Sequence, residues 1–386
     1  MSAFSLSSSR SKPIAIVDIQ SGSVSIAIGL LHPGKPLEIV ASGRSDLSFE
    51  DRSHEAAIAA LADQIDEAGK KALSAYADLQ KAHGPATQVY CIINTPWARS
   101  QTIRTIAKFD TEVLVTEHMI ADLAKQALDE STEIDLANLL EANVVRIELN
   151  GYVTTKPAGK HAHKVSIYAL ISGCEPQVHT ITKDALQKFF SAPIAFRSQL
   201  RTVLSVIEAM PHFEKDFCLV DITRDATIVA NIHTGLSMAH KTLDEGLLSI
   251  VKRVAGKGMP EETLALLRMV AEETCSTDAC TTITEATARA EPALVKVFAE
   301  GLVELTATRF APPRLVLLCE DALAPWLTTI FSRIDFTQFT TTTQPFEVLA
   351  LNAASLESFV VSSPKVSVDQ RLLLASALAS LEERGD

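Results

Sequence analysis

The sequence of 386 residues lacks three features, and each absence excludes a class of protein. No apolar run approaches the roughly 20 residues that a membrane-spanning helix needs. Basic residues are not in excess: the formal net charge is −12, which argues against a nucleic-acid partner because phosphate binding needs clustered Lys and Arg. Residues 1–12 contain no apolar core of the kind that secretory signals have, so we expect a disordered tail there.

The chain also lacks a cysteine framework. Its six cysteines lie mostly inside apolar runs, which is typical of reduced, buried thiols in a cytoplasmic protein. The one close pair, Cys275 and Cys280, has no second pair at zinc-ligand spacing and predicts no metal site. His161 and His163 could ligate a metal from one face of a strand, but without a third ligand nearby we favour a solvated loop.

Two Ile/Val-rich stretches organise the chain. Ile14 to Leu31 has two apolar runs around a polar centre that begins at Asp18, which is typical of two buried strands joined by a tight turn. Phe217 to Ile232 repeats this pattern, with Asp221 at the end of its first run. A carboxylate at such a strand end, beside small residues, can hold a phosphate or its Mg²⁺. The alternative is an ordinary hairpin with a solvated aspartate.

Each stretch heads a succession of strands and amphipathic helices, and the hydrophobic content of 47% is ample for buried cores. A Thr-rich segment from Cys275 to Thr284 is predicted to be a loop before a helix over Glu285 to Arg309. An internal repeat of this kind predicts two similar α/β domains facing a cleft. The predicted division is a disordered tail at 1–12, the first half at 13–96, an inserted α+β subdomain at 97–164, a return to the first half at 165–210, the second half at 211–362, and a C-terminal tail with a helix at 363–386.

In their order these elements resemble the actin-like ATPase superfamily, which implies duplicated, ribonuclease H-like α/β domains. IAIVDIQSGSVSIAIG is similar to the family's first phosphate-binding hairpin, and LVDITRDATIVANIHTG to the second. LDEGLLSIVKRVA resembles the helix that follows, and LVLLCEDALAPWL the adenosine-binding strand and loop. Within the superfamily the chain looks most like the bacterial cell-division protein FtsA, with the pilus-assembly protein PilM as a close relative, and the insert at 97–164 resembles the extra subdomain of FtsA.

The resemblance implies an ATP and magnesium site between the two hairpins. Asp18 and Asp221 would be the metal ligands, and no residue is assigned a catalytic role. The implied cofactor-binding residues come from both hairpins and the following helix: Asp18, Ser21, Gly22, Ser23, Asp221, Thr223, Thr227 and Gly246.

The nucleotide motifs depart from the family's pattern. The second hairpin reads Asp-Ile-Thr-Arg-Asp-Ala-Thr from Asp221, where the family has glycines that let the backbone approach phosphates closely. Asp225 brings a negative charge toward a γ-phosphate unless Mg²⁺ or Arg224 compensates. Cys319 to Ala322 replaces the glycine run of the adenosine motif. We therefore expect ATP and magnesium binding to be weak or absent, and the chain not to be an active ATPase.

The function expected from the resemblance is a cytoplasmic, FtsA-like scaffold of bacterial cell division, recruited to the inner face of the membrane. It would act through other division or pilus-assembly proteins or through self-association. The alternatives are a PilM-like scaffold of pilus or secretion assembly and an ATP-binding filament protein; a sugar kinase of the same fold has no supporting motif. The predicted C-terminal helix, Asp369 to Glu383, lacks the basic face and aromatic anchors that favour anionic lipid, so we expect it to dock on the body or on a partner.

Overall fold

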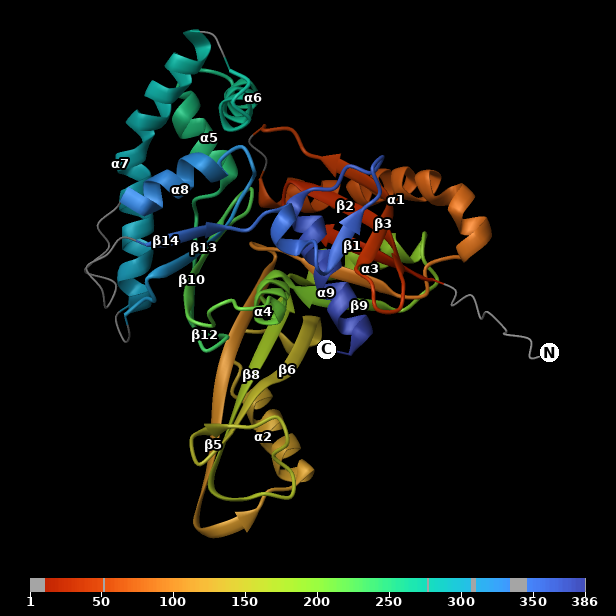
Figure 1. Ribbon diagram of the computed structural model, residues 1–386, viewed down its shortest axis with the longest axis vertical. Coiled ribbons are helices and arrows are strands. Elements are labelled where there is room, and N and C mark those ends of the chain that lie inside the picture. The colour runs from red at the N-terminus through yellow and green to blue at the C-terminus, as the bar shows by residue number, and fades with distance from the viewer. Residues whose placement is uncertain (1–10, 51–52, 276–277, 307–309, 334–345, 386) are drawn as a thin grey trace, which may run out of the picture.

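The computed structural model describes residues 11–50, 53–275, 278–306, 310–333 and 346–385. The predicted tail at 1–12 lies outside this part of the chain except for its last two residues, and so does the predicted helix end at 307–309. Figure 1 shows two α/β bodies side by side and a long arm that projects from them.

The first sheet contains the hairpin of the opening stretch. Its strands β1 and β2 pair antiparallel, with Asp18 opposite Ser25. On the other side of β1 lies β4, which runs parallel to it. The sheet order is β15-β3-β2-β1-β4-β9, with the strands β1 (Lys12–Ile19), β2 (Ser23–Leu31), β3 (Leu37–Asp46), β4 (Val89–Ile93), β9 (Ile194–Ser198) and β15 (Val360–Ser362).

The second sheet repeats the first. Its hairpin strands β10 and β11 pair antiparallel, with Asp221 opposite Ile228, and β13 runs parallel on the other side of β10. The order β12-β11-β10-β13-β14 comprises β10 (Phe217–Ile222), β11 (Thr227–His233), β12 (Leu236–Leu243), β13 (Arg314–Leu318) and β14 (Glu347–Ala350). The repeated order confirms the predicted duplicated α/β fold.

Amphipathic helices cover the outer faces of both sheets. Those on the first sheet are α1 (His54–His83) and α3 (Pro176–Gln187), whose buried residues share one core with β1, β2 and β4. A second core lies under α5 (Leu247–Ala255), α6 (Pro260–Ala271), α7 (Asp278–Thr306) and α8 (Ala324–Arg333) on the second sheet.

The C-terminal helix α9 (Gln370–Arg384) lies between the two sheets, beside α4 (Gln199–Ala209), and not on the surface. One hydrophobic core contains Ile16 of the first sheet, Leu219 of the second and Leu374 of α9. Every residue of α9 from Gln370 to Leu381 is buried, which explains why its apolar residues are not confined to one face. The expected docking on the body takes the form of burial between the two halves over residues 370–381.

The arm is a four-stranded sheet, β5-β8-β6-β7, with helix α2 (Glu117–Asp129) against it and a short 3₁₀ turn, η1 (Leu136–Asn138). Its strand β8 runs on to Cys174, past the predicted limit of the insert at residue 164. The domain limits themselves remain a prediction. The strands of the arm are β5 (Ala98–Leu114), β6 (Leu139–Leu149), β7 (Tyr152–Val153) and β8 (His161–Cys174).

Two expectations about the segment after α6 were wrong. Helix α7 begins at Asp278, so the Thr-rich stretch predicted as a loop up to Thr284 is largely helical. Cys275 and Cys280 form a disulfide, whereas the cysteine pattern predicted reduced thiols. The remaining four cysteines are buried and free, as expected, and burial raises the pKa of Cys174 and of Cys218 to about 12. Among the described residues no helix is both long and apolar enough to cross a membrane.

Candidate functional site

The first hairpin buries its aspartate completely. Asp18 is the penultimate residue of β1 and has no exposed surface. Its Oδ2 accepts a hydrogen bond from Nε2 of Gln20 at 2.6 Å, and its Oδ1 accepts one from Nδ2 of Asn94, just after β4, at 2.8 Å. The turn closes with the N–H of Gln20 donating to the carbonyl of Ser23. Both oxygens of the carboxylate are therefore engaged by neighbouring amides.

The environment of Asp18 favours its protonated form. Burial is the main cause that raises its pKa to about 6, and the negative charge of Asp369 acts in the same direction. The hydrogen bond from Asn94 and the charge of Arg371 oppose the rise without cancelling it. An aspartate that is ionised and bound to a metal needs the reverse arrangement, with a cation as the dominant neighbour.

The second hairpin also buries its aspartate, but against a cation. Asp221 is 1% exposed, and its Oδ1 accepts a hydrogen bond from Nη2 of Arg371 at 2.6 Å. The same nitrogen donates to the carbonyl of Ile222 at 2.6 Å, while Nη1 donates to Oδ1 of Asn94 at 3.4 Å. Since Asn94 also holds Asp18, Arg371 lies at the centre of a network that connects the two hairpins.

The predicted threonines of the second hairpin donate to backbone carbonyls of the second half. The hydroxyl of Thr223 donates to the carbonyl of Ala226 at 2.8 Å, and that of Thr227 to the carbonyl of Glu245 at 2.5 Å. The first free N–H groups of α5, which a phosphate would use, donate to the carbonyls of Thr223 and Arg224. Gly246 permits this approach, because a Cβ there would lie 2.4 Å from the carbonyl oxygen of Arg224.

Arg224 joins the two hairpins directly. Its Nη1 donates to the carbonyl of Ser21 at 3.3 Å, and its Nη2 to the carbonyl of Ser48 at 3.0 Å. The aliphatic part of the side chain covers Gly22 so closely that a Cβ on this glycine would lie 1.9 Å from Cδ of Arg224. The side chain that the sequence suggested as a counterion for Asp225 lies 3.9 Å from that carboxylate and makes its hydrogen bonds to the first half.

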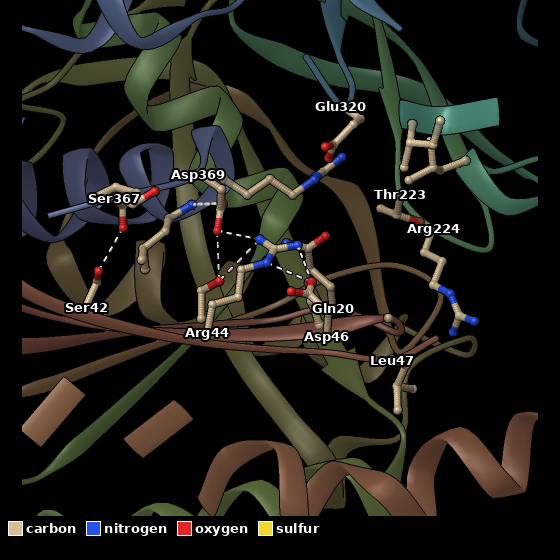
Figure 2. A pocket seen from close by; sticks show the side chains of 18 of the residues that line it. Gln20, Ser42, Arg44, Asp46, Leu47, Thr223, Arg224, Glu320, Ser367 and Asp369 are labelled. Carbon is tan, nitrogen blue, oxygen red and sulfur yellow. Dashed lines mark hydrogen bonds and ion pairs between the residues drawn. The ribbon is translucent and has the colours of Figure 1, made fainter. Parts of the chain in front are cut away.

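Beside these hairpins is a cavity of about 700 Å³, lined by both halves and by the start of α9. Of the predicted residues, Gly22, Ser23 and Thr223 line it; Asp18, Ser21, Asp221, Thr227 and Gly246 are not among its described lining residues. Several of its cations already pair with carboxylates: Arg44 lies between Asp46 and Asp369, as Figure 2 shows, and Arg268 is 3.2 Å from Glu320. The two candidate metal ligands, Asp18 and Asp221, are not described lining residues, but Gln20 and Arg371, which donate to them, are.

Two halves with the same strand order, each presenting a strand–aspartate–strand hairpin to a shared cavity, define the actin-like ATPase fold. The solved PilM–PilN type IV pilus biogenesis complex matches at 13% identity and a TM-score of 0.59, covering 96% of this chain and 98% of that chain. Ethanolamine utilization protein EutJ from Carboxydothermus hydrogenoformans matches at 11% identity, with 95% and 90% covered and a TM-score of 0.43. No family model and no curated protein matches the sequence. The likeness to PilM establishes the fold.

The residues present do not fit the magnesium–nucleotide group that this fold implies. A divalent cation needs several oxygen ligands directed at one point, but Asp18 is held by two amides and Asp221 by a guanidinium. The approach of a phosphate over Gly22 is blocked by Arg224. No reaction step through ATP is therefore derived for this chain.

Sequence reasoning missed four residues of this network, namely Asn94, Arg44, Asp369 and Arg371. Asn94 had a local signal, because it is a polar residue directly after a buried strand in the first half. Arg371 also had one, since it precedes three leucines in a helix that is otherwise poor in cations. The sequence predicted that this helix docks on the body or on a partner but did not indicate where, so its arginine was not connected with the hairpins.

Proposed function

We propose that this protein is an assembly scaffold of actin-like fold that binds partner proteins and does not turn over ATP. The observation that supports this most strongly is the position of Arg224, whose guanidinium donates to the carbonyls of Ser21 and Ser48 while its stem covers Gly22. The space between the hairpins, which phosphates would need, is thereby filled by the chain's own side chain. A fold that is retained while its nucleotide site is filled is consistent with a role in binding other proteins.

The partners we propose are proteins of a pilus or secretion assembly, which recruit this chain from the cytoplasm to the membrane. The support is the structural likeness to PilM over nearly the full length of both chains, in a structure that is itself a PilM–PilN complex. A role in cell division is the second candidate, because the four-stranded arm follows β4 of the first half, where the resemblance to FtsA predicts the extra subdomain.

Calorimetric titration with ATP and Mg²⁺, together with a phosphate-release assay, tests whether the chain is a scaffold without turnover. We expect neither a saturable heat of binding nor release of phosphate above the buffer rate. Saturable micromolar binding with phosphate release would overturn the proposal.

Deletion of the gene in the native cell separates the two candidate processes. Loss of surface pili or of secretion with normal cell length is the result expected for the pilus-type scaffold. Filamentous cells with normal pili would instead favour the division role.

A further inference from the structure

We infer that Arg371 is a built-in cation that takes the place of the divalent metal in this fold, so that the C-terminal helix acts as an intramolecular ligand of both halves. This inference deepens the proposed function and rests on it for the premise that the site is not used for ATP. It gives α9 the specific role of joining the two halves. It also implies a metal site that is occupied by Arg371 in the wild-type chain.

The first turn of α9 contacts both halves of the molecule. Asp369 caps the helix by accepting a hydrogen bond from the N–H of Leu372 at 2.9 Å. Its other oxygen accepts from Oγ of Ser25 at 2.8 Å and from Nη1 of Arg44 at 2.6 Å, both in the first half. Two residues later, Arg371 binds Asp221 in the second half. One helical turn therefore connects the two hairpin sheets.

Charge explains why a cation is needed here. The carboxylates of Asp18, Asp221 and Asp369 all interact electrostatically with Arg371, which is 7% exposed. Burial by itself lowers the pKa of Arg371, but these carboxylates, Asp221 foremost, raise it above its ordinary value, so the guanidinium stays charged. Burying a carboxylate without a positive charge nearby is energetically costly. Either a metal ion or a guanidinium can supply that positive charge.

A guanidinium differs from a metal because it cannot dissociate. Its fixed fork of donors reaches Asp221, the carbonyl of Ile222 and Asn94 at once. The two halves are therefore held together by a side chain that is always present, and not by a ligand whose occupancy depends on its concentration. Removing the guanidinium should leave the carboxylate of Asp221 and the amide oxygen of Asn94 without these donors, and Asn94 also holds the carboxylate of Asp18. Oxygen ligands of this kind suit a hard divalent cation.

The test is titration of the full chain with Mn²⁺ at pH 8, followed by electron paramagnetic resonance and by thermal unfolding. The variants Arg371→Gln and Arg371→Ala should bind one equivalent of Mn²⁺ at least about tenfold more tightly than the wild type, a difference measurable as a shift in midpoint concentration. Their unfolding temperature should rise with Mn²⁺, because a cation that binds only the folded state stabilises it. The wild type should show neither effect.

Three controls locate the effect at this site. Arg371→Lys keeps a cation near Asp221 and should not gain Mn²⁺ binding. The pair Asp221→Asn with Arg371→Met removes both charges and should stay folded without binding. Arg384→Ala changes the arginine at the other end of α9, which donates to the carbonyl of Lys35, and should behave as wild type.

The inference is overturned if the Arg371→Gln and Arg371→Ala chains are folded and bind Mn²⁺ no better than wild type, or if the doubly neutral variant binds equally well. It is also overturned if both single variants fail to fold and Mn²⁺ does not restore folding. The scaffold proposal fails on a different result, namely binding and hydrolysis of ATP by the wild type, so the two failures are distinguishable.

Discussion

The carboxylate of Asp221 and the guanidinium of Arg371 lie 2.6 Å apart, although 150 positions separate them in the chain. Both side chains are almost fully buried, and they join the end of β10 to the first turn of α9. Removing one partner of such a pair leaves the other charged and uncompensated, so the two residues should behave as one unit in folding.

The first prediction concerns the pH dependence that Asp18 contributes. Because its folded pKa of about 6 lies above the unfolded value near 3.9, the folded state retains a proton that the unfolded state releases between about pH 4 and pH 6. The free energy of unfolding of the wild type should therefore fall as pH rises through this window and then level off. Asn at this position does not titrate. Asp18→Asn should gain stability relative to wild type by about 3 kcal/mol between pH 4 and pH 8.

Urea unfolding of both chains at several pH values measures this difference, and the effects of titrating groups that do not interact with Asp18 cancel in the comparison. A difference that does not change with pH would mean that folding leaves the pKa of Asp18 unchanged. A difference of opposite slope would mean that a cation dominates its environment, as in a metal site.

The second prediction concerns the contact between Gly22 and Arg224. Gly22→Ala should destabilise the fold by roughly 1–3 kcal/mol, because the new methyl group overlaps the stem of Arg224 and forces it to move. Thermal or urea unfolding measures the loss. Combining Gly22→Ala with Arg224→Ala should recover part of it, since the clashing atoms are gone.

Gly34→Ala is a useful contrast, because a Cβ there meets nothing within 4 Å and any loss comes from its φ of 70° alone. If Arg224→Ala rescued Gly34→Ala as much as Gly22→Ala, or rescued neither, the close packing of Arg224 on the first hairpin would be refuted.

These residues also show how far the sequence alone predicts the structure. The two hairpins were predictable because Ile and Val runs around a polar turn determine strand pairing locally, and the aspartates at the strand ends followed from that. Arg224 was identified as a possible counterion from its neighbour Asp225, but its hydrogen bonds to Ser21 and Ser48 depend on how the halves face each other. Such a contact leaves no periodic signal in the sequence.

The third prediction concerns Asp369, which both caps α9 and binds the first half. Loss of a helix cap costs about 0.5–2 kcal/mol, and Asp369→Ala should reach or exceed the upper end because it also removes the acceptor for Ser25 and Arg44. Ser53→Ala is the matched control, since Ser53 caps the exposed start of α1, where its hydroxyl oxygen accepts a hydrogen bond from the N–H of Ala56. Equal losses in urea unfolding would mean that the contacts with the first half add nothing.

The C-terminal helix marks the limit of prediction from sequence in this protein. The sequence predicted a helix from residue 369, and the structure begins it at Gln370, with Asp369 as its cap. Its place between the sheets could not be predicted, because a helix buried on every side has no apolar stripe to indicate what it packs against. The role of Arg371 depends on its contact with Asp221, which lies 150 positions away in the chain, so it becomes apparent only in the folded structure.

A double-mutant cycle on Asp221 and Arg371 tests the central claim most directly. Asp221→Asn and Arg371→Met are made singly and together, and the free energy of unfolding of all four chains is measured in urea. We expect each single change to cost about 3–5 kcal/mol and the double change to cost clearly less than their sum, with a coupling energy of about 2 kcal/mol or more. Additive losses, with coupling below about 0.5 kcal/mol, would contradict the account, because the two residues would then not hold the halves together as one buried pair.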